Sequence, residues 1–547
     1  MFYRVFILCA IGCSLLGCVG SAFAQRGGSC ESAEATQHFR AGFAAAETRQ
    51  ARTAISKFQS CLQVEPSCVP CLYEIGWVYW TQSEWSNVIE NWEQVLQHEP
   101  HHVLVTTWLG PARDQASNRK TPGLDRTRVP IAVRSRPETS PVQMELVARF
   151  QSYNANPKDK TKDHYDQDIF SPKSARYSHD GSKVYVNSLE GYRTVVYDAQ
   201  SLTKRSVINH QFTAKSESLF QGQEAPFQYR FNKRPPSGQV NHFRGKPVES
   251  ELSHDGKFLW IPYYRRDFDG GATSPSAVAI IDTETDEIVR VMPTGPIPKY
   301  VEASPDGQWV AITHWGDNTV ALIDTSSGNP EEFTYRPELL VVVRQLSQKG
   351  LSGENRDKAC GYCLRGTVFT PDSKTLLVSR MSGGGIAGFD VESGRYLGTV
   401  RGMRPTPRHL VIDDKGQSLF LSSNASGYVS KVSLERLVQA LQGADGELVE
   451  LSAFEATFVG SGARTISLGS EDRYIFAAVH MGSEVVVIDS LTMKVVSRIR
   501  TDSFTVGLTV SPDGTQVWAT SQARGEEGGG NSVCVYEVTY PSPSAED

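Results

Sequence analysis

The sequence lacks any long apolar run beyond its first residues, and this absence excludes a membrane-spanning helix. A helical span needs ~20 consecutive apolar residues. The run from Val5 to Leu16 is shorter than that, and nothing later in the chain replaces it. A strong excess of one charge is missing too, since 55 Lys and Arg stand against 61 Asp and Glu for a net charge of −6. Nucleic-acid binding is therefore not expected from global charge, and any anion site has to come from local clustering.

Recognisable catalytic motifs are also absent. The chain has no Gly-x-Ser-x-Gly, no His-Glu-x-x-His and no phosphate-binding glycine loop. Cys68-x-x-Cys71 is followed by Leu72 instead of His, which excludes attachment of a c-type haem. The sequence thus predicts no catalytic residue, no metal and no cofactor. A lyase or an oxidoreductase remains the alternative, because a fold does not fix a function.

The N-terminal residues have the pattern of an export signal. Arg4 precedes the apolar run, and Ala22-Phe23-Ala24 supplies small residues for cleavage. This order is typical of a secretory signal peptide over residues 1–24. We therefore expect export to the periplasm or cell surface of a Gram-negative-type bacterium. Leu15-Leu16-Gly17-Cys18 resembles a lipobox, so a lipid anchor at Cys18 is the alternative to plain export.

Seven cysteines remain after the predicted cleavage, and their odd number leaves at least one thiol free or paired between chains. The seven are Cys30, Cys61, Cys68, Cys71, Cys360, Cys363 and Cys534. In an oxidising compartment the first six are expected to form disulfides. We predict disulfides among the first four, with their pairing open, and a local disulfide between Cys360 and Cys363. Cys534 lies in an apolar alternation, which predicts a buried, inert thiol.

A 34-residue period marks the first domain, predicted over residues 30–118. It relates Gly42, Gly76 and Gly110 to one another and Phe58 to Trp92. The pattern resembles the tetratricopeptide repeat, in which a small residue lets two antiparallel helices touch. Two repeats and a further half are expected. Such helix pairs form concave surfaces that bind partners, so we predict docking of a protein partner, with packing on the second domain as the alternative.

From about Ser171 the hydrophobic period becomes that of strands, and one turn motif recurs seven times. Its first residues are Ser178, Ser253, Ser304, Thr370, Asp413, Gly469 and Ser511. Gly and Asp form such turns because Gly accepts positive φ and Asp binds its own backbone. About four short strands accompany each turn, which predicts a mainly β fold, a seven-bladed β-propeller over residues 142–540.

The ends of the propeller carry three further predictions. The last blade has only three strands of its own, so Val142–Phe150, which alternates with period two, is expected to supply its outer strand. Residues 119–141, basic and proline-containing, are predicted to be the linker between domains. Residues 541–547 are predicted to be a disordered tail.

Two segments, Thr294–Gly307 and His314–Asp324, give the blades a family resemblance. They resemble the YVTN-repeat propellers of bacterial surface and periplasmic proteins, the YncE-like group. The resemblance spans roughly Ser171 to Val538. It implies the propeller fold and a role in binding or adhesion at the cell envelope; the best-known periplasmic member is associated with DNA binding. It implies no particular ligand.

Basic residues recur at one position of the blades, eight before the last residue of the turn. Five of the seven blades have one there, namely Lys173, Lys299, Arg365, Arg408 and Arg464. This position begins the innermost strand, at one mouth of the central channel. The second strands end on the same face, at His314, Arg380 and His480 among others. Converging cations focus a positive potential, which predicts an anionic ligand: a phosphate, a carboxylate, an acidic glycan or single-stranded nucleic acid.

Three alternatives accompany this prediction. If Glu249, Glu251 and Glu302 pair with the basic side chains, these side chains would line a solvent-filled channel mouth without binding a ligand. In an enzyme, the histidines and arginines of the mouth would serve as acid, base or anion clamp. The insertion from His210 to Lys246 interleaves aromatic and basic residues, a composition that can stack single-stranded bases or pack on its own blade.

Overall fold

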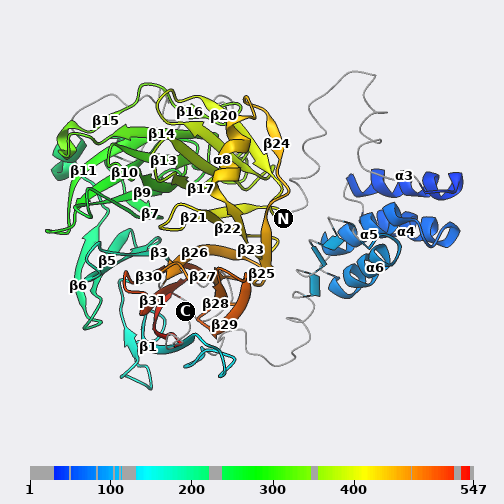
Figure 1. The fold of residues 1–547 in the computed structure, drawn as a ribbon, viewed down its shortest axis with the longest axis horizontal. Helices are drawn as coiled ribbons and strands as arrows, with labels where there is room; N and C mark the ends of the chain where they lie inside the picture. The colour runs from blue at the N-terminus through cyan, green and yellow to red at the C-terminus, as the bar shows by residue number, and fades with distance from the viewer. Residues whose placement is uncertain are drawn as a thin grey trace. The chain divides into compact units, whose positions relative to one another are not determined.

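The computed structural model divides the chain into two compact units, Met1–Leu124 and Asp125–Asp547 (Figure 1). It describes residues 30–47, 51–81, 84–100, 102, 105–106, 108–109, 112–113, 131–220, 237–346, 355–469, 471–522 and 531–541. The predicted signal peptide with Cys18, and nearly all of the predicted tail, lie outside these residues. No helix in the described part of the chain is long and apolar enough to cross a membrane.

Among the described residues, the first unit contains two helical hairpins, followed by further helical residues between 105 and 113. Its helices are α3 (Ala33–Glu47), α4 (Ala51–Val64), α5 (Val69–Thr81) and α6 (Trp85–His98). The helix α3 packs on α4, α4 on α5, and α5 on α6. A Cβ atom on Gly42 would lie 2.8 Å from the Phe58 ring, and one on Gly76 only 2.2 Å from Nε1 of Trp92. The 34-residue period therefore corresponds to the same glycine–aromatic contact in both hairpins; the predicted third glycine, Gly110, is not among the described residues.

We expect Gly76→Ala to destabilise the helical unit by about 1–3 kcal/mol, the usual effect of overfilling a tight contact. The added methyl group overlaps the buried Trp92 indole, although alanine is otherwise the better helix former by about 1 kcal/mol. Thermal unfolding followed by helical circular dichroism measures the effect. Ala41→Leu, which adds volume at an exposed position of α3, is the control and should change little. A Gly76→Ala variant as stable as the parent would contradict the close contact.

The second unit is a seven-bladed β-propeller, as predicted. Blade one comprises β3 (Pro172–Tyr177), β4 (Lys183–Ser188), β5 (Arg193–Asp198) and β6 (Lys204–Asn209). Blade two comprises β7 (Gly245–Pro247), β8 (Glu251–Ser253), β9 (Phe258–Arg266), β10 (Ser276–Asp282) and β11 (Glu287–Thr294). Blade three comprises β12 (Pro298–Ala303), β13 (Trp309–His314), β14 (Thr319–Asp324), β15 (Thr334–Tyr335) and β16 (Leu340–Val341).

The remaining blades follow in chain order. Blade four comprises β17 (Leu364–Phe369), β18 (Thr375–Arg380), β19 (Ile386–Asp390), β20 (Tyr396–Arg401) and β24 (Leu448–Glu450). Blade five comprises β21 (Pro407–Ile412), β22 (Ser418–Ser423), β23 (Tyr428–Ser433) and β25 (Glu455–Phe458). Blade six comprises β26 (Ala463–Gly469), β27 (Tyr474–Val479), β28 (Glu484–Asp489) and β29 (Lys494–Arg500). Blade seven comprises β30 (Thr505–Val510), β31 (Gln516–Ser521), β32 (Ser532–Thr539), β1 (Gln143–Gln151) and β2 (Asp163–Tyr165).

The ring closes between the two ends of the propeller sequence. The strand β1 pairs antiparallel with β32, from Gln143 opposite Thr539 to Gln151 opposite Ser532, and lies beside it in blade seven (Figure 1). The prediction that this segment supplies the outer strand of the last blade is confirmed. Residues 131–141, assigned to the linker by the sequence, bind the propeller as well. In this segment the amide of Ala132 donates to the Arg500 carbonyl at 2.9 Å.

Two inserted segments differ from a plain blade. Between β23 and β25 the chain forms α8 (Leu434–Gln442), which the sequence analysis did not anticipate and which packs on blade four. The insertion after blade one contains a 3₁₀ helix (Ala214–Phe220). Its Phe212 and Phe243 side chains are buried against Tyr263 of β9. These two aromatic residues pack on their own neighbourhood and do not offer a stacking surface, whereas residues 221–236 lie outside the described chain.

Candidate functional site

The basic residues predicted at the channel mouth occupy an irregularity that recurs in the innermost strands. In β12 the pairing shifts between Pro298 and Tyr300, which leaves Lys299 in a β-bulge. In β3 the same shift leaves Lys173 unpaired. The corresponding shifts in β17, β21 and β26 surround Arg365, Arg408 and Arg464. A bulge changes the direction of a side chain locally. The five basic residues therefore occupy equivalent positions in the innermost strands of their blades.

Two of these residues bind one buried carboxylate, Glu249. The ammonium of Lys173 lies 3.2 Å from Glu249 Oε1, and the Arg365 guanidinium lies 2.6 Å from the same atom. Burial alone would raise the pKa of Glu249, but Lys173 and Arg365 outweigh it and hold the pKa below its ordinary value.

The remaining arginines affect Lys173 electrostatically. Burial lowers the pKa of Lys173 well below its ordinary value, against the opposing attraction of Glu249. Repulsion from Arg365, Arg464 and Arg408 lowers that pKa further. The basic side chains of the mouth are therefore close enough to affect one another electrostatically.

Lys299 extends this cluster toward the loop before blade four. Its ammonium lies 3.1 Å from Asp357 and is bordered by two aromatic rings, 4.1 Å from the centroid of Tyr264 and 5.0 Å from that of Trp315. Burial lowers the pKa of Lys299 to about 7, with repulsion from Arg365 contributing and Asp357 opposing. Lys299 is thus a cation that loses its proton near neutral pH.

Below the mouth, the innermost strands of all seven blades enclose a cavity of about 270 Å³. In six of the seven blades the first and third residues after the basic position line the cavity, and Glu249 is one of them; blade four contributes only the third, Val368, and its neighbour Phe369. The polar lining residues are Ser174, Arg176, Glu249, Ser250, Glu251, Tyr300, Glu302, His409, Thr465, Ser467 and Thr509. Because Lys173 and Arg365 both bind Glu249, they are separated from the cavity by a single side chain.

Deeper in the channel lies a second charged group. Arg176 forms an ion pair with Glu251, and both residues also line a wider cavity of about 900 Å³ at the face of the blade turns. This pair therefore stands between the two cavities. Burial and repulsion from Glu251 raise the pKa of Glu302 well above its ordinary value. Glu302 consequently keeps its proton at pH values where an exposed glutamate has lost it.

A neutral histidine completes the channel wall. Nε2 of His409 lies 2.8 Å from the Tyr300 hydroxyl, and its Nδ1 accepts a hydrogen bond of 3.4 Å from the amide of Ile466. Burial lowers the pKa of His409 to about 3. Sequence reasoning missed His409, Tyr300 and Arg176. The signal was available: Tyr300 and His409 stand one residue after the basic position and Arg176 stands three after it, so all three lie on the same face of their strands, where side chains alternate with period two.

Two of the predicted mouth residues lie elsewhere. His314 is fully buried inside blade three, with its ring nitrogens 2.8 Å from the hydroxyls of Thr294 and Thr319. Arg380 points along blade four, where it donates to the Thr399 hydroxyl at 2.7 Å and stacks on the Tyr362 ring. His314 thus contacts β11 of blade two and β14 of blade three, and Arg380 contacts β20 of blade four; a role of either residue in anion binding stays a prediction.

His480 lies near the edge of the basic cluster. Its ring centroid is 4.6 Å from that of Phe504, and the Arg464 guanidinium lies 5.8 Å from the same Phe504 ring. Nδ1 of His480 is 2.9 Å from the Gly462 carbonyl oxygen. A Cβ atom on Gly462 would lie 2.3 Å from that nitrogen, so glycine is needed for the close approach.

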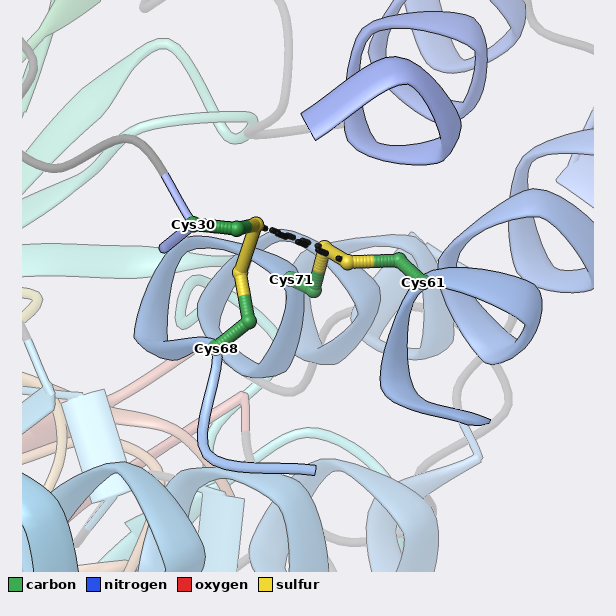
Figure 2. A group of neighbouring side chains, drawn as sticks. All are labelled: Cys30, Cys61, Cys68 and Cys71. Carbon is green, nitrogen blue, oxygen red and sulfur yellow. Dashed lines mark hydrogen bonds between the residues drawn. A yellow bond between two sulfur atoms is a disulfide. The ribbon is translucent and has the colours of Figure 1, made fainter. Parts of the chain in front are cut away.

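All six cysteines predicted to pair do form disulfides. The first unit contains Cys30–Cys68 and Cys61–Cys71 (Figure 2), and the loop before β17 contains Cys360–Cys363. Cys534 is a buried free thiol, as expected. The loop with the third disulfide also carries Asp357, the partner of Lys299.

Comparisons with known proteins do not assign this chain to a family. No family model matches the chain, and no curated protein matches it. Among solved structures, hydrazine synthase of Kuenenia stuttgartiensis is 15% identical with a TM-score of 0.46, over 69% of this chain and 96% of that one. The β-propeller domain of Cps50 (Swd1) from Myceliophteria thermophila is 10% identical with a TM-score of 0.46, over 68% and 97%. Such low identities carry no argument about function.

Proposed function

We propose that the propeller binds an anionic ligand at the basic mouth of its central channel. The observation that carries the proposal is the convergence of five basic side chains: Lys173 and Arg365 bind Glu249, Lys299 binds Asp357, and Arg408 and Arg464 lie close enough to affect one or both lysines electrostatically. Removing charges from water is unfavourable unless opposite charges compensate them. An anion at this mouth would be attracted by the basic side chains that converge there.

The deciding experiment is a binding screen by calorimetry at low ionic strength. The probes are inorganic phosphate, citrate, an acidic oligosaccharide and a single-stranded oligonucleotide. A double variant Arg408→Ala/Arg464→Ala is expected to lose a salt-sensitive hit. Lys358→Ala removes an exposed lysine next to Asp357 and should retain it. Absence of any hit, or a hit that the double variant keeps, would overturn the proposal.

Binding of the anion is expected to take up a proton near neutral pH. In the protein without ligand, Lys299 has a pKa of about 7. The negative charge of a bound anion raises this pKa. Between these two pKa values the free protein lacks a proton that the complex holds, so affinity should fall as the pH rises above about 7. Calorimetry in buffers of different ionisation enthalpy measures the proton directly. In Lys299→Met the uptake should disappear; an uptake of the same size there would assign it to another group.

Two wider roles belong to the same proposal. The two helical hairpins repeat at the 34-residue period that tetratricopeptide arrays share, which supports docking of a protein partner by the first unit. Three disulfides in the described chain support folding in an oxidising compartment and hence export. Pull-down with the exported protein and fractionation of the producing cell test these two roles.

An enzyme remains the second candidate, and one observation favours it. Glu302 holds a proton beside the Arg176–Glu251 pair within the channel, and a carboxyl group with a raised pKa can act as a general acid. His314, named for this role by the sequence, is fully buried. Turnover of an identified ligand, abolished by Glu302→Gln, would establish this alternative.

A further inference from the structure

The four cysteines of the first unit form a compact cluster of sulfur atoms that joins three separate parts of the chain. Cys61 lies in α4, Cys71 lies in the first turn of α5, Cys68 immediately precedes α5, and Cys30 precedes α3. All four Sγ atoms lie within 4.8 Å of one another, and all four residues are buried (Figure 2). Two separate disulfides would require the sulfur atoms to be close only within each bonded pair, and not all four to be close together.

The distances between the two disulfides match those of a metal centre. A tetrahedral Zn²⁺ site with Zn–S bonds of about 2.3 Å places its sulfur atoms about 3.8 Å apart. Sγ of Cys30 lies 3.7 Å from that of Cys61 and 3.8 Å from that of Cys71 (Figure 2). The two bonded pairs would have to separate for the four sulfur atoms to take up tetrahedral positions, and all four already lie within 4.8 Å of one another.

The surroundings favour thiolates over thiols. Cys68 and Cys71 stand at the N-terminus of α5, whose first turn has no acidic residue, and the positive end of a helix dipole stabilises a thiolate. Their Cys-x-x-Cys spacing is common in structural zinc sites. The segment after Cys30 is fixed independently of the sulfur atoms, since the Glu65 carboxylate accepts hydrogen bonds of 3.0 and 2.8 Å from the amides of Glu31 and Ser32.

We propose that this cluster is a redox-dependent zinc site: two disulfides when oxidised, and one Zn²⁺ bound by four thiolates when reduced. Each disulfide takes two electrons and two protons from a dithiol reductant, which itself becomes a disulfide. Zn²⁺ then displaces the four thiol protons, and four Zn–S bonds form without further electron transfer. The inference is independent of the anion site, because it concerns only the first unit.

The test uses the full-length protein, reduced by a phosphine and freed of reductant. We expect the reduced protein to bind one Zn²⁺ per chain and the oxidised protein to bind none. Co²⁺ in place of Zn²⁺ should give the visible absorption of a tetrahedral tetrathiolate. Zinc should also protect four cysteines from alkylation, which mass spectrometry should identify as Cys30, Cys61, Cys68 and Cys71.

Two paired variants assign the site. Cys61→Ser/Cys71→Ser is expected to lose the cobalt absorption, whereas Cys360→Ser/Cys363→Ser should keep it. If reduction unfolds the helical unit, Zn²⁺ should restore its circular dichroism, since metal binding then contributes to folding. The proposal is overturned if the reduced protein binds no Zn²⁺, if zinc protects other cysteines, or if the Cys61→Ser/Cys71→Ser variant still binds.

Discussion

The Glu249→Gln variant is expected to lose about 3–5 kcal/mol of the free energy of unfolding of the propeller, because removing one partner leaves buried charges uncompensated. Glu249 is largely buried and holds Lys173 and Arg365 directly. The amide is almost isosteric with the carboxylate, so packing does not change. Added phosphate should restore part of the loss, since it replaces the missing negative charge.

The same variant should bind phosphate more tightly than the parent, by about tenfold if the gain is about 1.4 kcal/mol. In the parent protein, the Glu249 carboxylate supplies the negative charge that pairs with Lys173 and Arg365. Without this carboxylate, the two cations can pair with an added anion instead. Denaturant unfolding and calorimetry measure the two effects separately. Glu284→Gln, at an exposed position of blade two, serves as the control. Equal stability of Glu249→Gln and the parent would show that the cations do not depend on Glu249.

Phe150→Ala should destabilise the propeller by about 3–5 kcal/mol, the usual effect of emptying a buried aromatic site. Phe150 is 5% exposed and lies on β1. Its ring centroid is 4.4 Å from that of Tyr197 in blade one and 5.7 Å from that of Trp518 in blade seven. One side chain therefore fills the junction at which the ring closes.

Tyr165→Ala is the matched control, since Tyr165 belongs to β2 in the same sheet but is 48% exposed. Its loss should change stability by less than about 0.5 kcal/mol. Denaturant unfolding followed by near-ultraviolet circular dichroism reports on the aromatic junction. Comparable losses in the two variants would mean that the exposed edge of the sheet, and not its buried junction, limits stability.

The architecture of the propeller was predictable because its local signals repeat. Each turn places a carboxylate or a glycine where the backbone needs it; for example, Asp180 accepts a hydrogen bond of 3.0 Å from the amide of Ser182, and Gly181 has a φ of 71°. The outer strand β1 was predictable from its alternation and from the missing strand of blade seven. The helix α8 was missed although Leu434, Leu437 and Leu441 are spaced for one apolar face, because a single short helix has no repeat to reveal it.

The channel was predictable only in part. Aligning the turns located the basic position, because in each blade this position lies the same number of residues before the turn. The side-chain directions of His314 and Arg380 were not predictable, since each stands at the end of a strand, where the pairing with the neighbouring strands decides the direction. The pairing of Cys30 with Cys68 was likewise open, because spacing along the chain does not show which helix ends meet.

The pairing of β1 with β32 also sets an order of events during synthesis. Gln143 is synthesised long before its partner Thr539, because the two residues lie far apart along the chain. Until β32 has been synthesised, β1 lacks the strand with which it pairs. Such long-range pairing is slow, because a long loop has to close first. An unpaired strand edge is a template for aggregation. The nascent propeller therefore needs protection until its final strand arrives, and a chain truncated before β32 should be a substrate for holding chaperones and proteases.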